Sequence, residues 1–345
     1  MSKKILFYLI IVIISIINPI TVLAQEKLIF SADVIRHGDR TPISEFPKSP
    51  YLWNEGLGEL TPKGMQQEYE LGVRLHQRYI EQYHLLPTHY ASDNLYVEST
   101  DTNRTLMSAQ CFLLGLYPLE SGPYLNQNQF ALPSGFQPIP VHIENNYLII
   151  KPRRNPISLI RMNYEYYKLN KNKYLFNEKF KRWSDATGIK IKDFSDLDTL
   201  ADTLFVRQQH NIPLPNGISQ ADADEIIFIS TNNWLTLFQQ SDFSYPTGHK
   251  FLVRLKKYLQ DAASDKNKLK SIFFFAHDST ILGILDTMGV QQNHWPQYAE
   301  DLNFSLFQDN KNYFVKITLN DKPIIIPTCK SNICAWSKFL EVINK

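Results

Sequence analysis

Short apolar runs that end abruptly in polar residues recur along the chain and predict buried strands. The three clearest runs lie at residues 28–35, 95–97 and 271–276. Their short length favours strands over helices. Helical spacing of apolar residues follows at about residues 62–80, 102–116 and 281–288. Strands that alternate with helices predict an α/β sheet, whose ligands bind beyond the carboxyl ends of the strands.

The middle of the chain, from about residue 120 to 245, has a different pattern. Its apolar runs are interrupted by Asn, Tyr, Lys and Pro, which indicates a mostly helical insertion. Helices are predicted at residues 159–170, 178–187, 197–209 and 248–259. Residues 226–239 are apolar enough to pack back onto the main body.

We therefore predict an α/β fold in which a three-layer sandwich carries a smaller domain. Residues 25–120 and 245–345 would form a mixed sheet flanked by helices, with a late hairpin over residues 302–319. A mainly helical cap domain, residues 121–244, would be inserted between these two parts. A chain of 345 residues is long enough for about two domains.

The first 24 residues have the layout of a secretory signal peptide. Lys3 and Lys4 precede an apolar run over residues 5–17, and Ala24 is a small residue suited to cleavage. The alternative is a transmembrane anchor, but the run is shorter than the roughly 20 residues that a spanning helix needs. We expect a periplasmic or secreted protein with no membrane attachment after cleavage.

The net charge of the chain excludes one class of partner. The chain has 36 Lys and Arg against 34 Asp and Glu, a formal net charge of +2. The leader contributes two lysines and no acid, so the mature chain is neutral. This argues against nucleic acid as a partner, because a nucleic-acid-binding protein should have a strongly basic face.

The three cysteines predict one disulfide and no metal site. Cys329 and Cys334 are close enough in sequence to close a small disulfide loop in an exported protein. Cys111 lies in an apolar helical run and is expected to be a buried, inert thiol. No Cys-x-x-Cys motif or His/Cys cluster suggests a bound metal.

Residues suited to binding phosphate follow all three predicted strands. Arg36 and Arg40 flank His37 directly after the first strand. Guanidinium groups match phosphate oxygens geometrically and stay protonated. Arg104 lies in the first turn of a predicted helix, where free N–H groups also favour an anion. His277 follows the third strand and adds a donor if it is protonated.

His37 and Asp278 are the candidate reacting groups. A neutral imidazole can attack phosphorus, and surrounding cations lower its pKa and help to keep it neutral. The leaving alkoxide or phenoxide needs a proton, for which Asp278 is the candidate general acid. That role requires its pKa to rise through burial, or an acidic medium. Each residue alone would be unremarkable, but their order after three strands points to phosphate chemistry.

Residues 36–42, Arg-His-Gly-Asp-Arg-Thr-Pro, resemble the signature of the histidine acid phosphatases. Residues 99–109 resemble the second phosphate-binding segment of that family, and His277-Asp278 resembles its distal His-Asp pair. Further similarity to prostatic-type members lies at residues 60–72 and 138–142. The resemblance extends over most of the chain.

The resemblance implies a role for each site residue. The phosphate would be bound by Arg36, Arg40, Arg104 and His277. His37 would form a phosphohistidine that water hydrolyses, and Asp278 would protonate the leaving group. No metal or organic cofactor is expected. The expected substrates are small phosphate monoesters, with phosphotyrosine among the candidates, and the resemblance is compatible with a homodimer.

Three alternatives stay open. A phytase or sugar-phosphate phosphatase would use the same chemistry and differ in the charges that line the pocket beyond the phosphate. A phosphoglycerate-type mutase usually continues its motif as Arg-His-Gly-Glu and is normally cytoplasmic, which the leader argues against. An exported binding protein that has lost catalysis should lack the nucleophile or proton donor, and both are present.

Glu98 stands where prostatic-type relatives often have arginine, so it is expected to place a negative charge near the mouth of the site.

Overall fold

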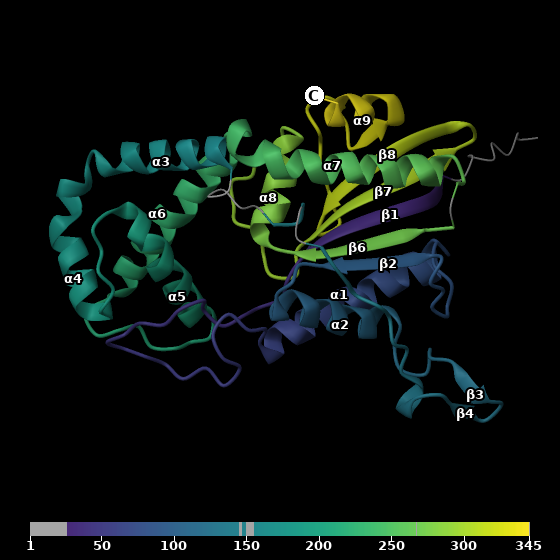
Figure 1. Cartoon of the computed structure of the whole chain (residues 1–345), viewed down its shortest axis with the longest axis horizontal. Coiled ribbons are helices and arrows are strands. Elements are labelled where there is room, and N and C mark those ends of the chain that lie inside the picture. Colours follow the sequence, from purple (N-terminus) through teal and green to yellow (C-terminus); the bar gives the residue numbers. More distant parts are fainter. Residues whose placement is uncertain (1–25, 145–146, 150–154, 267, 345) are drawn as a thin grey trace, which may run out of the picture.

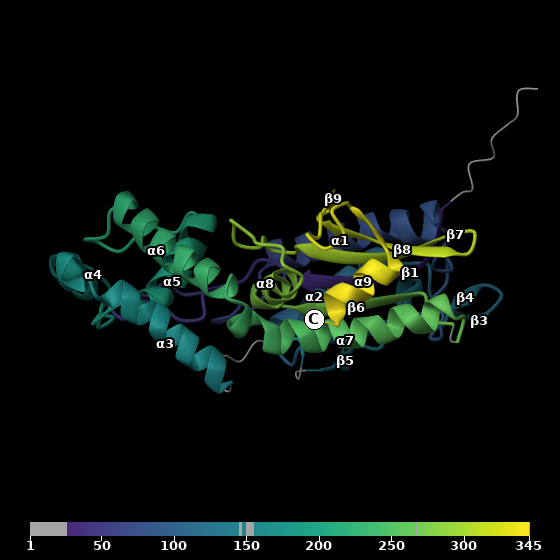
Figure 2. The ribbon, with the colours of Figure 1, turned by 90° about the horizontal axis from the view of Figure 1, so that it is seen from above.

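The computed structural model describes residues 26–144, 147–149, 155–266 and 268–344. The signal peptide predicted for residues 1–24 lies outside them. Both views show a sheet with helices on its two faces and, at one end, a separate group of helices (Figures 1 and 2). Within the described part of the chain, no helix is long and apolar enough to cross a membrane.

A mixed sheet in the order β10-β8-β7-β1-β6-β2-β5 forms the centre of the body. Its strands are β1 (Lys27–Arg36), β2 (Leu95–Ser99), β5 (His142–Ile143), β6 (Ser271–Ala276), β7 (Asp301–Asp309), β8 (Asn312–Leu319) and β10 (Ile333–Ala335), and β9 (Lys322–Pro323) pairs with β8. β1, β6, β2 and β5 are parallel, whereas β7 pairs antiparallel with β1 and β8. The predicted strands and the late hairpin are confirmed, and so is the three-layer α/β fold.

The alternation of side chains along β6 explains the two helical layers. Every residue of β6 is buried, and successive side chains point to opposite faces of a strand. The body helices are α1 (Pro62–His76), α2 (Asn103–Leu116), α7 (Ser241–Ala263), α8 (Asp278–Thr287) and α9 (Trp336–Ile343). Phe273 and Phe275 pack with α1 and α2, whereas Phe274 packs with α7, α8 and α9. Each face of the sheet therefore has its own apolar core.

Local capping fixes where the helices near the strand ends begin. Thr61 caps α1, because its Oγ1 accepts a hydrogen bond of 3.1 Å from the Gly64 N–H. α8 begins at Asp278 rather than at the predicted residue 281. His277, in extended conformation, is its N-cap, so the carboxyl of Asp278 lies in the first turn of the helix.

A second group of helices packs around its own apolar core. It consists of α3 (Pro156–Asn170), α4 (Asn177–Thr187), α5 (Leu197–Gln209) and α6 (Gln220–Phe238). Trp183, Leu204 and Ile226 are fully buried in this core. Ahead of it, β3 (Tyr124–Asn126) and β4 (Gln129–Phe130) form a separate hairpin, and β5 joins the main sheet beside β2. The domain limits at residues 121 and 244 stay a prediction.

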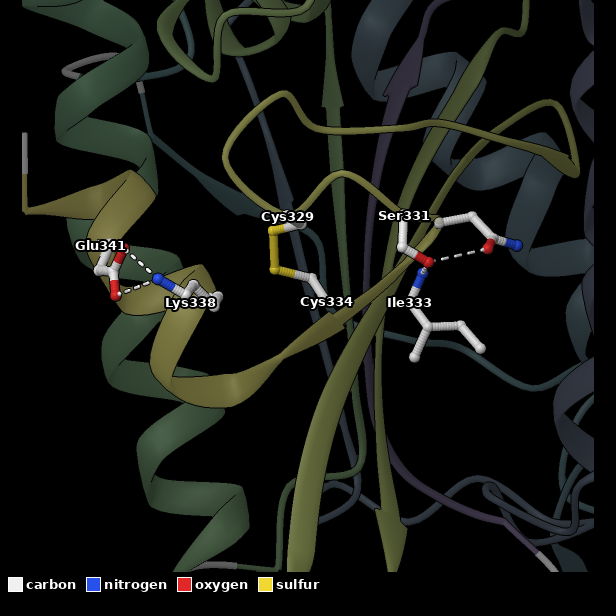
Figure 3. The surroundings of a disulfide bond; sticks show 7 residues. Cys329, Ser331, Ile333, Cys334, Lys338 and Glu341 are labelled. Carbon is white, nitrogen blue, oxygen red and sulfur yellow. Dashed lines mark hydrogen bonds and ion pairs between the residues drawn. A yellow bond between two sulfur atoms is a disulfide. The ribbon is translucent and has the colours of Figure 1, made fainter.

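A disulfide joins Cys329 and Cys334, as predicted (Figure 3). Cys334 lies on β10 opposite Val315 of β8, and Cys329 lies in the loop that precedes β10. Inside the closed loop, the Ile333 N–H donates to Ser331 Oγ over 3.2 Å. Cys111 is free and half-buried, and burial raises the pKa of its thiol, which disfavours the reactive thiolate.

Candidate active site

β1, β2 and β6 end side by side at one edge of the sheet. Arg36, the last residue of β1, pairs with Ala276, the last residue of β6, and Ser99 of β2 pairs with Phe275. Segments far apart in the sequence therefore leave the sheet at the same place. These segments carry all six predicted site residues, namely Arg36, His37, Arg40, Arg104, His277 and Asp278.

His37 is held in one orientation by backbone groups. The side chain of His37 is buried, and the backbone N–H of His37 donates to the Ala276 carbonyl over 3.1 Å. Nδ1 lies 2.8 Å from the Gly38 carbonyl, which only accepts, so Nδ1 carries the ring proton and Nε2 has a free lone pair. Burial, followed by the charges of Arg36 and Arg104, lowers the pKa of His37 well below its ordinary value. The imidazole is therefore neutral.

Three arginines surround His37 with donors that have no acceptor among the described residues. The Nε atoms of Arg36, Arg40 and Arg104 are all buried and unpaired. Such a donor costs about 1–3 kcal/mol if it stays unsatisfied. Arg104 also donates from Nη1 to the Gly58 carbonyl over 3.3 Å. The three N–H groups make the site complementary to an anion with several oxygens.

Acceptors from other segments orient the guanidinium groups of Arg36 and Arg40. Arg36 donates from Nη1 to the Pro296 carbonyl over 2.5 Å, and its Nη2 lies 2.8 Å from Asp278 Oδ2. Arg40 forms a two-point contact with Asp202, with distances of 2.6 Å to Oδ1 and 3.3 Å to Oδ2. Both arginines thus keep their charge paired while Nε stays free.

Asp278 is bonded on both carboxyl oxygens. Oδ1 accepts from the Ser279 N–H over 2.7 Å, and Oδ2 accepts from the Trp295 indole N–H over 3.1 Å. Burial alone raises the pKa of this carboxyl, but Arg36 and His277 favour the charged form, and the resulting pKa is below the ordinary value. In the free site Asp278 is a carboxylate, whereas the role expected for it requires a proton.

His277 lies beside His37 and is also neutral. Its ring meets the His37 ring edge-on, with centroids 5.6 Å apart, and its Nε2 is 3.1 Å from Thr100 Oγ1. Burial and the charge of Arg104 lower the pKa of His277 to about 4. Above that pH it offers one N–H and no positive charge.

A cleft of about 780 Å³ lies between the strand ends and the helices α5 and α6. Arg36, Arg40 and Asp278 line it, whereas His37, Arg104 and His277 are not part of its lining. Its aromatic lining consists of Phe205, Trp234, Phe238, Trp295 and Tyr298. Beyond the two arginines and Asp278, its charged residues are Lys63, Asp198 and Asp202. A hollow of about 1170 Å³ on the far side of Asp198 and Trp234 holds none of the predicted site residues.

Sequence reasoning missed the groups that orient the arginines. Asp202 lies 162 positions from Arg40 in the sequence and belongs to the helical segment. Trp295 and Tyr298 come from the loop between α8 and β7, and the Arg36 guanidinium lies 4.3 Å above the Tyr298 ring. No motif marks these residues.

The expectation for Glu98 is wrong. The side chain is buried, it forms an ion pair with Arg254 of α7, and it accepts a hydrogen bond from the Tyr147 hydroxyl. It does not line the cleft. Arg254 compensates its charge, so Glu98 stabilises the contact between α7 and β2 instead of acting on substrate.

Comparison with known proteins agrees with this geometry. Prostatic acid phosphatase of Bos taurus is 30% identical, with 92% of this chain and 85% of that protein covered. Lysosomal acid phosphatase of Bos taurus is also 30% identical, with 92% and 77% covered. Two solved phytase structures share the fold at 16% identity: that of Klebsiella sp. ASR1 (TM-score 0.66, coverage 92% and 95%) and that of Hafnia alvei in complex with myo-inositol hexakis sulphate (TM-score 0.65, coverage 93% and 97%). Residues 27–146 and 220–320 match the family described as the histidine phosphatase superfamily (branch 2), and this chain belongs to that family.

Proposed function

We propose that this protein is an acid phosphatase that hydrolyses phosphate monoesters through a phosphohistidine on His37. The observation that carries the proposal is the set of three buried, unpaired Nε–H groups around a neutral imidazole. Family membership and similarity to acid phosphatases support the same activity. The substrate phosphate would accept from Arg36, Arg40 and Arg104, and His277 would complete the binding set.

The reaction would proceed in two steps. In the first, the Nε2 lone pair of His37 attacks phosphorus, the ester P–O bond breaks, and the leaving oxygen takes a proton from Asp278. The Gly38 carbonyl stabilises the charged ring through Nδ1–H. In the second, water attacks phosphorus, Asp278 takes a proton from that water, the N–P bond breaks, and inorganic phosphate leaves.

Substrate binding would itself raise the pKa of Asp278 and so favour its protonated form. In the free site, the pairing of Asp278 with Arg36 contributes to its low pKa. A phosphate dianion bound to the same guanidinium places a second negative charge beside the carboxylate and raises its pKa. An acidic medium, near the phosphate second pKa of about 6, favours the same protonation state. We therefore expect activity to be highest on the acid side of neutrality.

The lining of the cleft favours a small monoester with an aromatic or apolar leaving group. Aromatic side chains form much of the wall beyond the phosphate position. Asp198 and Asp202 line the cleft together with Lys63, so this wall has no excess of positive charge. A substrate with many phosphates, such as phytate, would meet two carboxylates. Phosphotyrosine is the kind of substrate that fits, and a phytase is the less favoured alternative.

The remaining sequence-based expectations stay part of this proposal. The leader-like residues 1–24 and the disulfide fit a periplasmic or secreted enzyme. The helical cap over residues 121–244 would shape the leaving-group side of the cleft. A homodimer is proposed from the resemblance to prostatic-type enzymes.

The experiment is a phosphatase assay on residues 25–345. Release of p-nitrophenol from its phosphate ester is followed from acidic to neutral pH, with a chelator and no added metal. We expect activity that survives the chelator and is lost in His37→Ala. His89→Ala is the matched control, because His89 is exposed and its ring nitrogen bonds the Ser121 carbonyl, outside the candidate site. An inactive folded wild type, or full activity in His37→Ala, would refute the mechanism.

A further inference from the structure

The segment that follows the nucleophile packs against the helical group and not against the sheet. In Figure 1 the purple chain after β1 runs out toward α5 before it returns to α1. Phe46, in this segment, is fully buried in the core shared by α4, α5 and α6. Residues 39–49 therefore belong to the catalytic motif at one end and to the helical group at the other.

The first half of α5 holds this segment through two residues. Asp202 pairs with the Arg40 guanidinium at 2.6 and 3.3 Å and accepts from the Ile43 N–H over 2.9 Å. Thr203 Oγ1 donates to the Ser44 carbonyl over 3.0 Å. Asp202 thus orients the guanidinium of Arg40, which is proposed to bind phosphate, and also fixes the backbone at Ile43.

The second half of α5 makes two more contacts. Arg207 is buried, donates to Glu45 Oε1 over 2.6 Å, and lies 5.0 Å from the Phe46 ring. His210, the C-cap of α5, has its Nε2 2.7 Å from Oδ2 of Asp39, which is an ion-pair distance without the alignment of a hydrogen bond. The four contacts lie along one helix and its C-cap, at positions 202, 203, 207 and 210. A shift of residues 39–49 would therefore require a shift of α5.

Asp39 connects His210 to the nucleophile through a single peptide group. The carbonyl of that peptide belongs to Gly38 and accepts from Nδ1 of His37 over 2.8 Å. Its N–H belongs to Asp39 and donates to Gln67 Oε1 over 2.8 Å. The Asp39 side chain, fully buried, is held by His210 and by Thr61. A shift of Asp39 would tilt the carbonyl that sets the tautomer and direction of the imidazole.

We propose that α5 acts as a latch, by which we mean that it holds residues 37–49, the loop that carries His37 and Arg40, in its active position. His210 and Asp202 are the positioning residues. His210 acts through Asp39 on the orientation of His37, and Asp202 acts through Arg40 on phosphate binding. The inference rests on the proposed function, because its readout is phosphatase activity. It adds that residues of the helical group set both the rate and the affinity, although none of them touches phosphorus.

The two roles predict different kinetic changes. His210→Ala should lower kcat by about tenfold or more and leave KM nearly unchanged, since misplacement by 1 Å can cost roughly a hundredfold in rate. His210→Gln should restore most of kcat, because its amide can still place a polar N–H beside Asp39. Asp202→Ala should mainly raise KM, because Arg40 loses its orientation. Gln208→Ala is the control, since Gln208 lies on the same helix and its exposed side-chain amide donates to Asp224.

A second variant separates positioning from stability. His210→Phe keeps the packing of a ring against Trp53, whose centroid is 5.3 Å from that of His210, but removes the polar contact with Asp39. If His210→Ala fails to fold, a lower kcat in folded His210→Phe supports the latch. Wild-type kcat in folded His210→Ala or His210→Phe would overturn it, and so would a lower KM in Asp202→Ala, which would mean that Asp202 competes with substrate. An inactive wild type would instead refute the phosphatase itself.

Discussion

Asp33 is a buried carboxyl whose protonation should make this protein more stable in acid. It lies on β1, fully buried in the sheet. Oδ1 accepts from the Tyr79 hydroxyl at 2.8 Å and the Asn303 amide at 2.9 Å, and Oδ2 accepts from the Ser31 hydroxyl at 3.2 Å. Burial outweighs these bonds and raises the pKa of Asp33 to about 6. Asp301, a second buried carboxyl, also has a raised pKa.

The magnitude follows from the difference between folded and unfolded pKa values. For Asp33 the pKa is about 6 in the folded chain against 3.8 for the free group, and one unit corresponds to 1.36 kcal/mol. The folded state binds the proton more tightly, so this contribution is fully present below pH 3.8 and is lost as the pH rises through about 6. The whole titration corresponds to about 3 kcal/mol, of which about 2 kcal/mol should be lost between pH 4 and pH 7, because the unfolded carboxyl is already about half ionised at pH 4.

The substitution that tests this is Asp33→Asn, which keeps the shape and removes the titration. Urea unfolding of wild type and variant is measured at steps from pH 4 to pH 7. We expect the variant to gain on the wild type as the pH rises, by about 2 kcal/mol at pH 7 relative to pH 4. Asp93→Asn is the control, because Asp93 is exposed and forms a surface ion pair with Lys268. A difference between wild type and Asp33→Asn that is the same at every pH would refute the reasoning.

Three further predictions concern the site and the scaffold. Asp278→Asn should lower kcat more for alkyl phosphates than for p-nitrophenyl phosphate, because a poor leaving group depends more on the proton; equal losses for both esters would contradict the acid role. Arg254→Ala should lower the free energy of unfolding by about 3 kcal/mol in urea titrations, because it leaves the buried carboxylate of Glu98 without its cation. Cys329→Ser together with Cys334→Ser should cost about 2 kcal/mol in the same assay, the chain-entropy value for so short a loop, and no change would mean that the loop is equally constrained without the bond.

The sheet and the clustering of the six candidate site residues could be predicted because their signals are local. A buried strand, a polar residue at its end and a helix cap are each encoded within about ten residues, as in β6 followed by His277 and Asp278. Parallel pairing then brings the three strand ends together without any further information. Glu98 shows the limit of this reasoning, because its partner Arg254 lies 156 positions away and decides whether the charge faces substrate or core.

The residues that escaped prediction share a physical property: they act only after distant segments have packed. Asp202 is an ordinary acid on an amphipathic helix until the segment after β1 enters the core of the helical group. The pKa of Asp278 could not be predicted either, because burial and cations shift it in opposite directions and the positions of Arg36, His277 and Arg40 in the packed chain decide the direction. The identity of the candidate reacting groups is therefore a property of the sequence near three strand ends. Their protonation and alignment are properties of the packed chain, which is why the helical group has to be tested together with the catalytic motif.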